Sequence, residues 1–167
     1  CKDNDINEVL EELKPYIGLT DTNVGEMLVY KNDTIVSSSL ALYGEYSYIE
    51  LEIIARWLDQ SSLHLDIGTN IGYHALAINK ITQCDVMGFE PQMNHFAIAA
   101  YNTKDKNIQL NRAAVGKSTG TIRISDFVPS TMGNYGEMHI TEDDTGSEVP
   151  VVAVDDLNLE RCSSMKI

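Results

Sequence analysis

The stretch Leu65-Asp66-Ile67-Gly68-Thr69-Asn70-Ile71-Gly72-Tyr73 decides the fold that we predict for this chain. It closes a short apolar run, 63–67, and opens a segment with helical periodicity, 72–81. A strand that ends in an acid, a turn of small residues and then a helix are the first half of a βαβ unit. Glycines in such a turn let the backbone approach a ligand, and the first N–H groups of the helix are free to bind a polar or anionic group.

The same alternation continues along the chain. Residues 85–90 read as a second strand, 93–102 as a second helix and 107–115 as a third strand. Strands alternating with helices of about ten residues predict an α/β fold with a parallel sheet. The loops that follow parallel strands share one edge of the sheet, which is where we expect a ligand.

The spacing of the first loop distinguishes between cofactors. A dinucleotide-binding loop has the pattern G-x-G-x-x-G, whereas here Asn70 stands two residues after Gly68 and Gly72 two after that. The resulting D-x-G-x-N-x-G pattern fits the acid-and-glycine loop of methyltransferases that use S-adenosyl-L-methionine (SAM). An ordinary tight turn between strand and helix is the alternative. The candidate cofactor-binding residues in this loop are Asp66, Gly68, Thr69, Asn70 and Gly72.

Glu90 is the candidate for a second contact with the cofactor. It ends the second predicted strand, 18 residues after Gly72. An acidic residue about 20 residues beyond the loop, at the tip of the second strand, is where a ribose diol is held. Ionised carboxylate oxygens only accept hydrogen bonds, so one carboxylate can bind both hydroxyls.

Four segments resemble, in order, the landmarks of FkbM-type SAM-dependent methyltransferases: 66–72, 88–91, 111–116 and 154–157. The resemblance implies a Rossmann-like SAM-dependent methyltransferase fold with three layers and a mostly parallel sheet. It also implies SAM as cofactor and O-methylation of a hydroxyl on a sugar, glycan or other secondary-metabolite acceptor. By the same resemblance Ala113 lies near the adenine, although packing of small residues in a buried strand explains it equally well.

Two domains are expected, an N-terminal extension, 1–45, and a SAM-binding domain, 46–167. The extension is predicted to hold a helix over 5–17, with its last turn in doubt at Pro15, and a hairpin whose strands are 27–30 and 34–36. In the family, the strand beginning at Met165 continues into an Asp-x-Glu-Gly segment, so we expect the domain to be incomplete at its C-terminal end. The alternatives are therefore an incomplete or non-catalytic Rossmann-like fragment and, in another enzyme class, a nucleotide-dependent oxidoreductase.

Further elements are predicted on either side of this alternation. A turn at 116–120 suggests that 121–124 forms a hairpin with the strand before it, and 126–147 reads as a long loop that would carry acceptor specificity. Residues 148–154 read as a strand and 155–162 as a short helix. A helix is expected over 46–59, and its predicted buried stripe comprises Ile49, Ile53, Ile54, Trp57 and Leu58.

Composition excludes several classes of function. The formal net charge of −13 argues against binding nucleic acid, whose phosphates favour basic surfaces. No apolar run approaches the ~20 residues of a membrane span. The three cysteines stand far apart, without a C-x-x-C pair, which favours reduced thiols in a cytoplasmic protein and argues against a structural metal site. His74, His95 and His139 are possible general bases, but nothing in the sequence places one beside an acceptor, so no catalytic residue is assigned.

Overall fold

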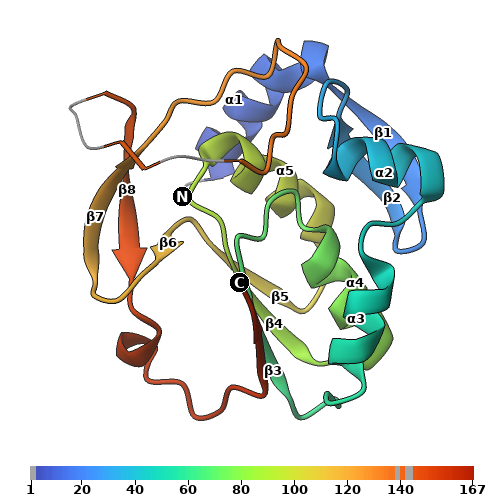
Figure 1. Cartoon of the computed structure of the whole chain (residues 1–167), viewed down its shortest axis with the longest axis vertical. Helices are drawn as coiled ribbons and strands as arrows, with labels where there is room; N and C mark the ends of the chain where they lie inside the picture. Colours follow the sequence, from blue (N-terminus) through green and yellow to red (C-terminus); the bar gives the residue numbers. More distant parts are fainter. Residues whose placement is uncertain (1–2, 138–139, 142–144) are drawn as a thin grey trace.

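Four parallel strands form the central sheet of the computed structural model, which describes residues 3–137, 140–141 and 145–167 (Figure 1). The order across the sheet is β5-β4-β3-β9. By order along the chain these are its third, second, first and fourth strands, the arrangement of a Rossmann-like α/β fold. The bounds are β3 (Leu63–Ile67), β4 (Asp85–Phe89), β5 (Ile108–Asn111) and β9 (Ser164–Lys166).

Alternate side chains of the strands enter two separate apolar clusters, as the period of two in a strand requires. Val86 packs with residues of α4 (Tyr73–Thr82) and α5 (Met93–Thr103), the helices that connect β3 to β4 and β4 to β5. Leu65 and Phe89 enter the other cluster, which residues after β5 complete. The helix predicted over 72–81 is confirmed as α4, and its residues Ala75, Leu76, Ala77 and Ile78 are buried.

The N-terminal segment, which comprises residues 3–55, packs against α5 and shares the apolar cluster that contains Val86. The helix α1 ends at Leu13, and Pro15 lies in the short 3₁₀ turn that follows. No helix within the described residues is both long and apolar enough to cross a membrane. The elements of this segment are α1 (Asp3–Leu13), η1 (Lys14–Tyr16), β1 (Ile17–Thr22), β2 (Gly25–Tyr30), α2 (Val36–Tyr43) and α3 (Tyr48–Ala55).

The predicted hairpin of the extension is right in its first strand, since 27–30 lies within β2, and wrong in its second. The antiparallel pair is β1 with β2, and its turn lies between Thr22 and Gly25. Gly25 has a φ of +120°, and the Thr22 hydroxyl bonds both to the Gly25 carbonyl oxygen and to the Val24 N–H. The second predicted strand is instead the start of helix α2, because the Asp33 carboxylate accepts the N–H groups of Ile35 and Ser37 and so begins a helical turn.

The predicted buried stripe of the helix before β3 is also wrong in part. Leu51 faces the core at 1% exposure, whereas Ile49 is 75% and Trp57 80% exposed. Ile53 is exposed too, while Ile54 and Leu58 pack partly against the core. The α3 sequence is apolar on more than one side, so periodicity alone did not determine which side meets α4.

The third predicted strand divides between two sheets. After β5 ends at Asn111, the chain turns at Ala113, whose N–H donates to the Asn111 carbonyl oxygen at 3.0 Å. The following β6 (Ala114–Val115) belongs to a second sheet, with order β6-β8-β7. Since β8 (Ser147–Val152) lies between β6 and β7 (Gly120–Ile124), the hairpin predicted around 116–120 does not form. The short helix predicted over 155–162 is a 3₁₀ turn, η2 (Val154–Leu157).

We expect Leu51→Ala to destabilise the fold by about 2–5 kcal/mol, because it removes a fully buried side chain from the contact with α4. Ile49→Ala on the same helix is the matched control and should change stability by about 0.5 kcal/mol or less. Urea unfolding followed by circular dichroism measures both. Equal losses in the two variants would contradict this orientation of α3.

Candidate functional site

The loop after β3 folds back over the end of β4. The N–H groups of Gly68 and Thr69 both donate to the Phe89 carbonyl oxygen, at 2.9 and 3.0 Å. Gly68, Asn70 and Gly72 all have positive φ, at +74°, +52° and +93°. Glycine adopts this conformation without strain, and asparagine tolerates it better than most residues do. The G-x-N-x-G part of the pattern therefore suits the backbone of this loop.

Two of the glycines have different surroundings. A Cβ on Gly72 would lie 3.2 Å from the Thr103 methyl and 3.4 Å from Ala99 Cα, so Gly72 lets α4 approach α5 closely. A Cβ on Gly68 would have no atom within 4 Å, so the space in front of Gly68 is open. Gly72 thus serves packing, whereas Gly68 borders space that a ligand can enter.

Glu90 joins the loop to the end of β4. It is 4% exposed, and its two carboxylate oxygens accept the N–H groups of Asn70, at 2.8 Å, and Gln92, at 2.9 Å. Burial raises the pKa of Glu90 to about 7, although these two hydrogen bonds act in the opposite direction. Near neutral pH the side chain therefore exchanges between a carboxylic acid and a carboxylate.

Asp66 and Lys166 form an ion pair where two neighbouring strands end. They are register partners on β3 and β9, and Lys166 Nζ lies 3.3 Å from Oδ1 of Asp66. Asp66 is fully buried, and neither of its oxygens has a hydrogen bond among the described residues. Lys166 Nζ also donates to the Gly68 carbonyl oxygen at 3.2 Å. From β3 the chain continues to β4 and β5 on one side of β3, and it returns to β9 on the other side. α/β sheets bind ligands at the carboxyl ends of the two strands where the strand order changes sides in this way, and Asp66 and Lys166 lie there.

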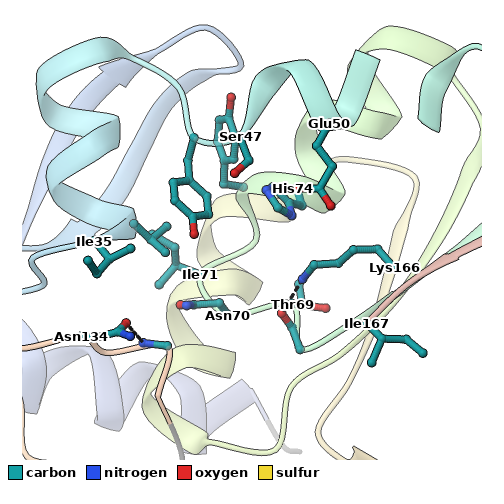
Figure 2. Close-up of a pocket in the computed structure, with 15 residues that line it drawn as sticks. Ile35, Ser47, Glu50, Thr69, Asn70, Ile71, His74, Asn134, Lys166 and Ile167 are labelled. Carbon is teal, nitrogen blue, oxygen red and sulfur yellow. Dashed lines mark hydrogen bonds between the residues drawn. The ribbon is translucent and has the colours of Figure 1, made fainter. Parts of the chain in front are cut away.

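Two cavities border the loop. The larger has a volume of about 380 Å³, and Figure 2 shows Lys166 extending toward the loop at Thr69, with His74 and Glu50 also on the wall. The smaller, of about 160 Å³, reaches Glu90 and the segment from Ser125 to Val128. The two cavities share Gly68, Asn70 and Gly136. An elongated ligand crossing this shared wall would reach both.

The predicted cofactor residues lie close together but differ in exposure to the cavities. Gly68 and Asn70 line both cavities, Thr69 lines the larger and Glu90 the smaller. Asp66 and Gly72 lie behind these walls. Ala113 belongs to the buried apolar cluster of Leu65 and Phe89, and it lines neither of the two cavities.

Sequence reasoning missed several wall residues. Lys166 had one available signal, a lysine within an apolar strand, while Asn134 and Phe127 come from the long loop and had none. His74 lines the larger cavity, with its pKa lowered by burial. His95 lines the smaller one, and burial lowers its pKa to about 4. His139 lies outside the described residues.

Comparison with known proteins gives partial likenesses to methyltransferase structures. No family model and no curated protein matches the chain. A SAM-dependent methyltransferase from Agrobacterium tumefaciens is 10% identical, with 58% of this chain and 32% of that one covered and a TM-score of 0.44. Phosphoethanolamine N-methyltransferase 2 of Haemonchus contortus, in complex with phosphomonomethylethanolamine and S-adenosylhomocysteine, is 24% identical, with coverages of 39% and 16% and a TM-score of 0.35.

A third structure is geranyl diphosphate methyltransferase in complex with GPP and sinefungin. It is 14% identical, with 64% of this chain and 43% of that one covered and a TM-score of 0.37. This chain thus spans less than half the length of each of these three proteins. The strand order and the parallel register, not these likenesses, define the fold.

We expect Glu90 to make stability depend on pH. An acid whose pKa is higher in the folded chain than in the unfolded chain binds its proton more tightly when folded, so its contribution is present at low pH. That contribution is lost as pH rises from the ordinary value of 4.5 to about 7, and amounts to about 3 kcal/mol. Urea unfolding at several pH values should show a flatter profile for Glu90→Gln than for the wild type. The exposed Glu160→Gln should keep the wild-type profile.

Lys166→Met should destabilise the fold by about 3–5 kcal/mol, because it leaves the buried Asp66 carboxylate without its cation. Arg161→Met is the control: its pair with Asp85 is about half exposed on both sides, so the loss should stay within about 1 kcal/mol. Chemical unfolding compares the two. The double variant Lys166→Met with Asp66→Asn should recover part of the loss, and a Lys166→Met protein as stable as the control would contradict this role of the ion pair.

Proposed function

We propose that this chain binds SAM and is the cofactor-binding part of a SAM-dependent methyltransferase. The observation that carries the proposal is the contact between Glu90 and the loop after β3. Its carboxylate accepts the Asn70 N–H and reaches the smaller cavity, while Gly68 and Asn70 also line the larger one. A nucleoside bound at Glu90 would therefore be continuous with an amino-acid group lying along the loop.

The residues present fit the chemical parts of SAM. The open space in front of Gly68 admits a ligand against the backbone. Gly68 borders both cavities and its carbonyl oxygen is an acceptor for an ammonium, while Lys166, on the wall of the larger cavity, offers a cation to a carboxylate. Glu90 offers two oxygens to the two ribose hydroxyls. A ligand that carries an ammonium, a carboxylate and a diol thus has a partner for each group.

The part of the larger cavity lined by Ile35, Tyr46 and His74, away from Lys166 and Gly68, is the proposed site of the methyl acceptor. Ile35 and Ile71 give it an apolar wall, and Tyr46, His74 and Glu50 add polar groups. This mixture suits a small molecule or glycan that presents a hydroxyl. The four sequence landmarks that resemble FkbM-type enzymes support O-methylation as the reaction.

SAM supplies an electrophilic methyl group, so the chain needs only to align the acceptor and exclude water. The Tyr46 and His74 rings stack, with centroids 5.7 Å apart, on the wall of the acceptor cavity. Burial lowers the pKa of His74, so its imidazole is neutral at pH 7 and can accept a proton. Its assignment as a base awaits an identified acceptor.

Glu90→Ala should weaken binding of S-adenosylhomocysteine by about 10- to 150-fold, since hydrogen bonds to a charged group contribute about 1.5–3 kcal/mol. Isothermal titration calorimetry measures the affinity, and Glu160→Ala, on the exposed surface, should leave it unchanged. Glu90→Gln keeps one acceptor oxygen and should give an intermediate value. Equal affinity in the wild type and Glu90→Ala would contradict this role of Glu90.

The same titration separates the alternatives. Binding of S-adenosylhomocysteine but not of NAD supports the methyltransferase proposal, and the reverse result supports a nucleotide-dependent oxidoreductase. Binding of neither ligand by the folded wild-type chain would favour a non-catalytic fragment.

A further inference from the structure

The Asp33 carboxylate joins two segments that lie far apart in the sequence. The side chain is 4% exposed, and its Oδ2 accepts the Ser37 N–H at 2.6 Å. Its Oδ1 accepts the N–H of Ile35 at 3.2 Å and that of Tyr135 at 3.3 Å, across 102 residues of sequence. One buried carboxylate therefore begins helix α2 and holds the segment 126–137, here called the wall loop.

Further hydrogen bonds link the same two segments. The Thr34 N–H donates to the Gly133 carbonyl oxygen at 2.9 Å, and the Gly133 N–H donates to the Asn32 carbonyl oxygen at 3.2 Å. Asp33 and Gly133 form a parallel β-bridge, and the Asn32 side-chain amide donates to the Pro129 carbonyl oxygen. The wall loop is thus attached to 32–34 by one parallel β-bridge and by the hydrogen bonds beside it.

The wall loop borders both cavities. Asn134 lines the larger one and Phe127 and Tyr135 the smaller, and Gly136 lines both. Within the wall loop, the centroid of the Phe127 ring lies 4.7 Å from that of Tyr135, and it lies 5.4 Å from that of Tyr30 on β2. The wall loop is therefore attached to the N-terminal segment by the hydrogen bonds at 32–34 and by the ring contact with Tyr30 of β2.

We propose that Asp33 is a positioning residue for the cofactor site: by holding the Tyr135 N–H, it keeps the wall loop in place as the outer wall of both cavities. This inference rests on the proposed function, because the ligand that occupies the cavities is taken to be SAM. Asp33 acts on that ligand through the loop, since it lines neither of the two cavities itself. Its removal should loosen the wall and weaken ligands that bridge the two cavities.

The two oxygens allow the two roles of Asp33 to be separated. Asp33→Ala removes the acceptors for both α2 and the loop. Asp33→Asn keeps one carbonyl oxygen, which can take the place of Oδ1 on Tyr135 and Ile35, while its NH₂ group cannot accept the Ser37 N–H. Asp33→Asn is therefore a variant that loosens the start of α2 and spares the loop.

Amide hydrogen exchange and titration with S-adenosylhomocysteine test the proposal. In Asp33→Ala, we expect faster exchange at 133–136 and affinity lower by about tenfold. In Asp33→Asn, exchange should rise only near Ser37, and the affinity should stay near the wild-type value. Equal losses of affinity in both variants, or unchanged exchange at 133–136 in Asp33→Ala, would overturn the proposal.

Two further outcomes are distinguishable. If Asp33→Ala does not fold, the exchange pattern of Asp33→Asn decides, because the proposal requires slow exchange at 133–136 beside fast exchange near Ser37. If the folded wild type does not bind S-adenosylhomocysteine, the proposed function fails, and the exchange experiment still reports whether Asp33 holds the loop.

Discussion

Parallel pairing of β3 with β4 is the constraint on which the rest of the site depends. In a parallel pair both strands run the same way, so their carboxyl ends meet at one edge of the sheet. The register Ile67↔Phe89 then brings the loop after β3 beside the residues that follow β4. From this alignment come the bonds of Gly68 and Thr69 to the Phe89 carbonyl oxygen and the contact of Glu90 with Asn70. The parallel pairing of β3 with β4 thus brings the residues of the candidate site together without a bound ligand.

Two buried acids at this edge are stabilised in different ways. Asp66 is paired with Lys166 from β9, and its oxygens have no hydrogen bond among the described residues. Glu90 is held by two backbone N–H groups, and burial raises its pKa to near neutrality. Removing a carboxylate from water is costly unless a partner compensates. Each acid therefore depends on the groups that hold it, Lys166 for Asp66 and two backbone N–H groups for Glu90.

The N-terminal segment and the wall loop complete the site from outside the sheet. Sequence order separates them by about a hundred residues, and the hydrogen bonds of Asp33 and Thr34 join them. Figure 1 shows α1 beside α5, and α3 lies beside α4. The N-terminal segment therefore lines part of the larger cavity, at Ile35 and Val36, and shares its apolar core with the sheet.

The sequence by itself determined the parts of this protein that are governed by local chemistry. Glycine and asparagine suit the positive φ angles at Gly68, Asn70 and Gly72, so the loop could be predicted from the sequence. The strands and helices on either side of the loop, and the acid at the end of β4, could be predicted as well. Tertiary structure alone decided that Lys166 pairs with Asp66, that Asp33 holds Tyr135, and that Leu51 rather than Ile49 faces the core. It also divided the predicted third strand between two sheets. The physical reason is that such contacts depend on register and on packing between distant segments, whereas a sequence pattern records only the preferences of neighbouring residues.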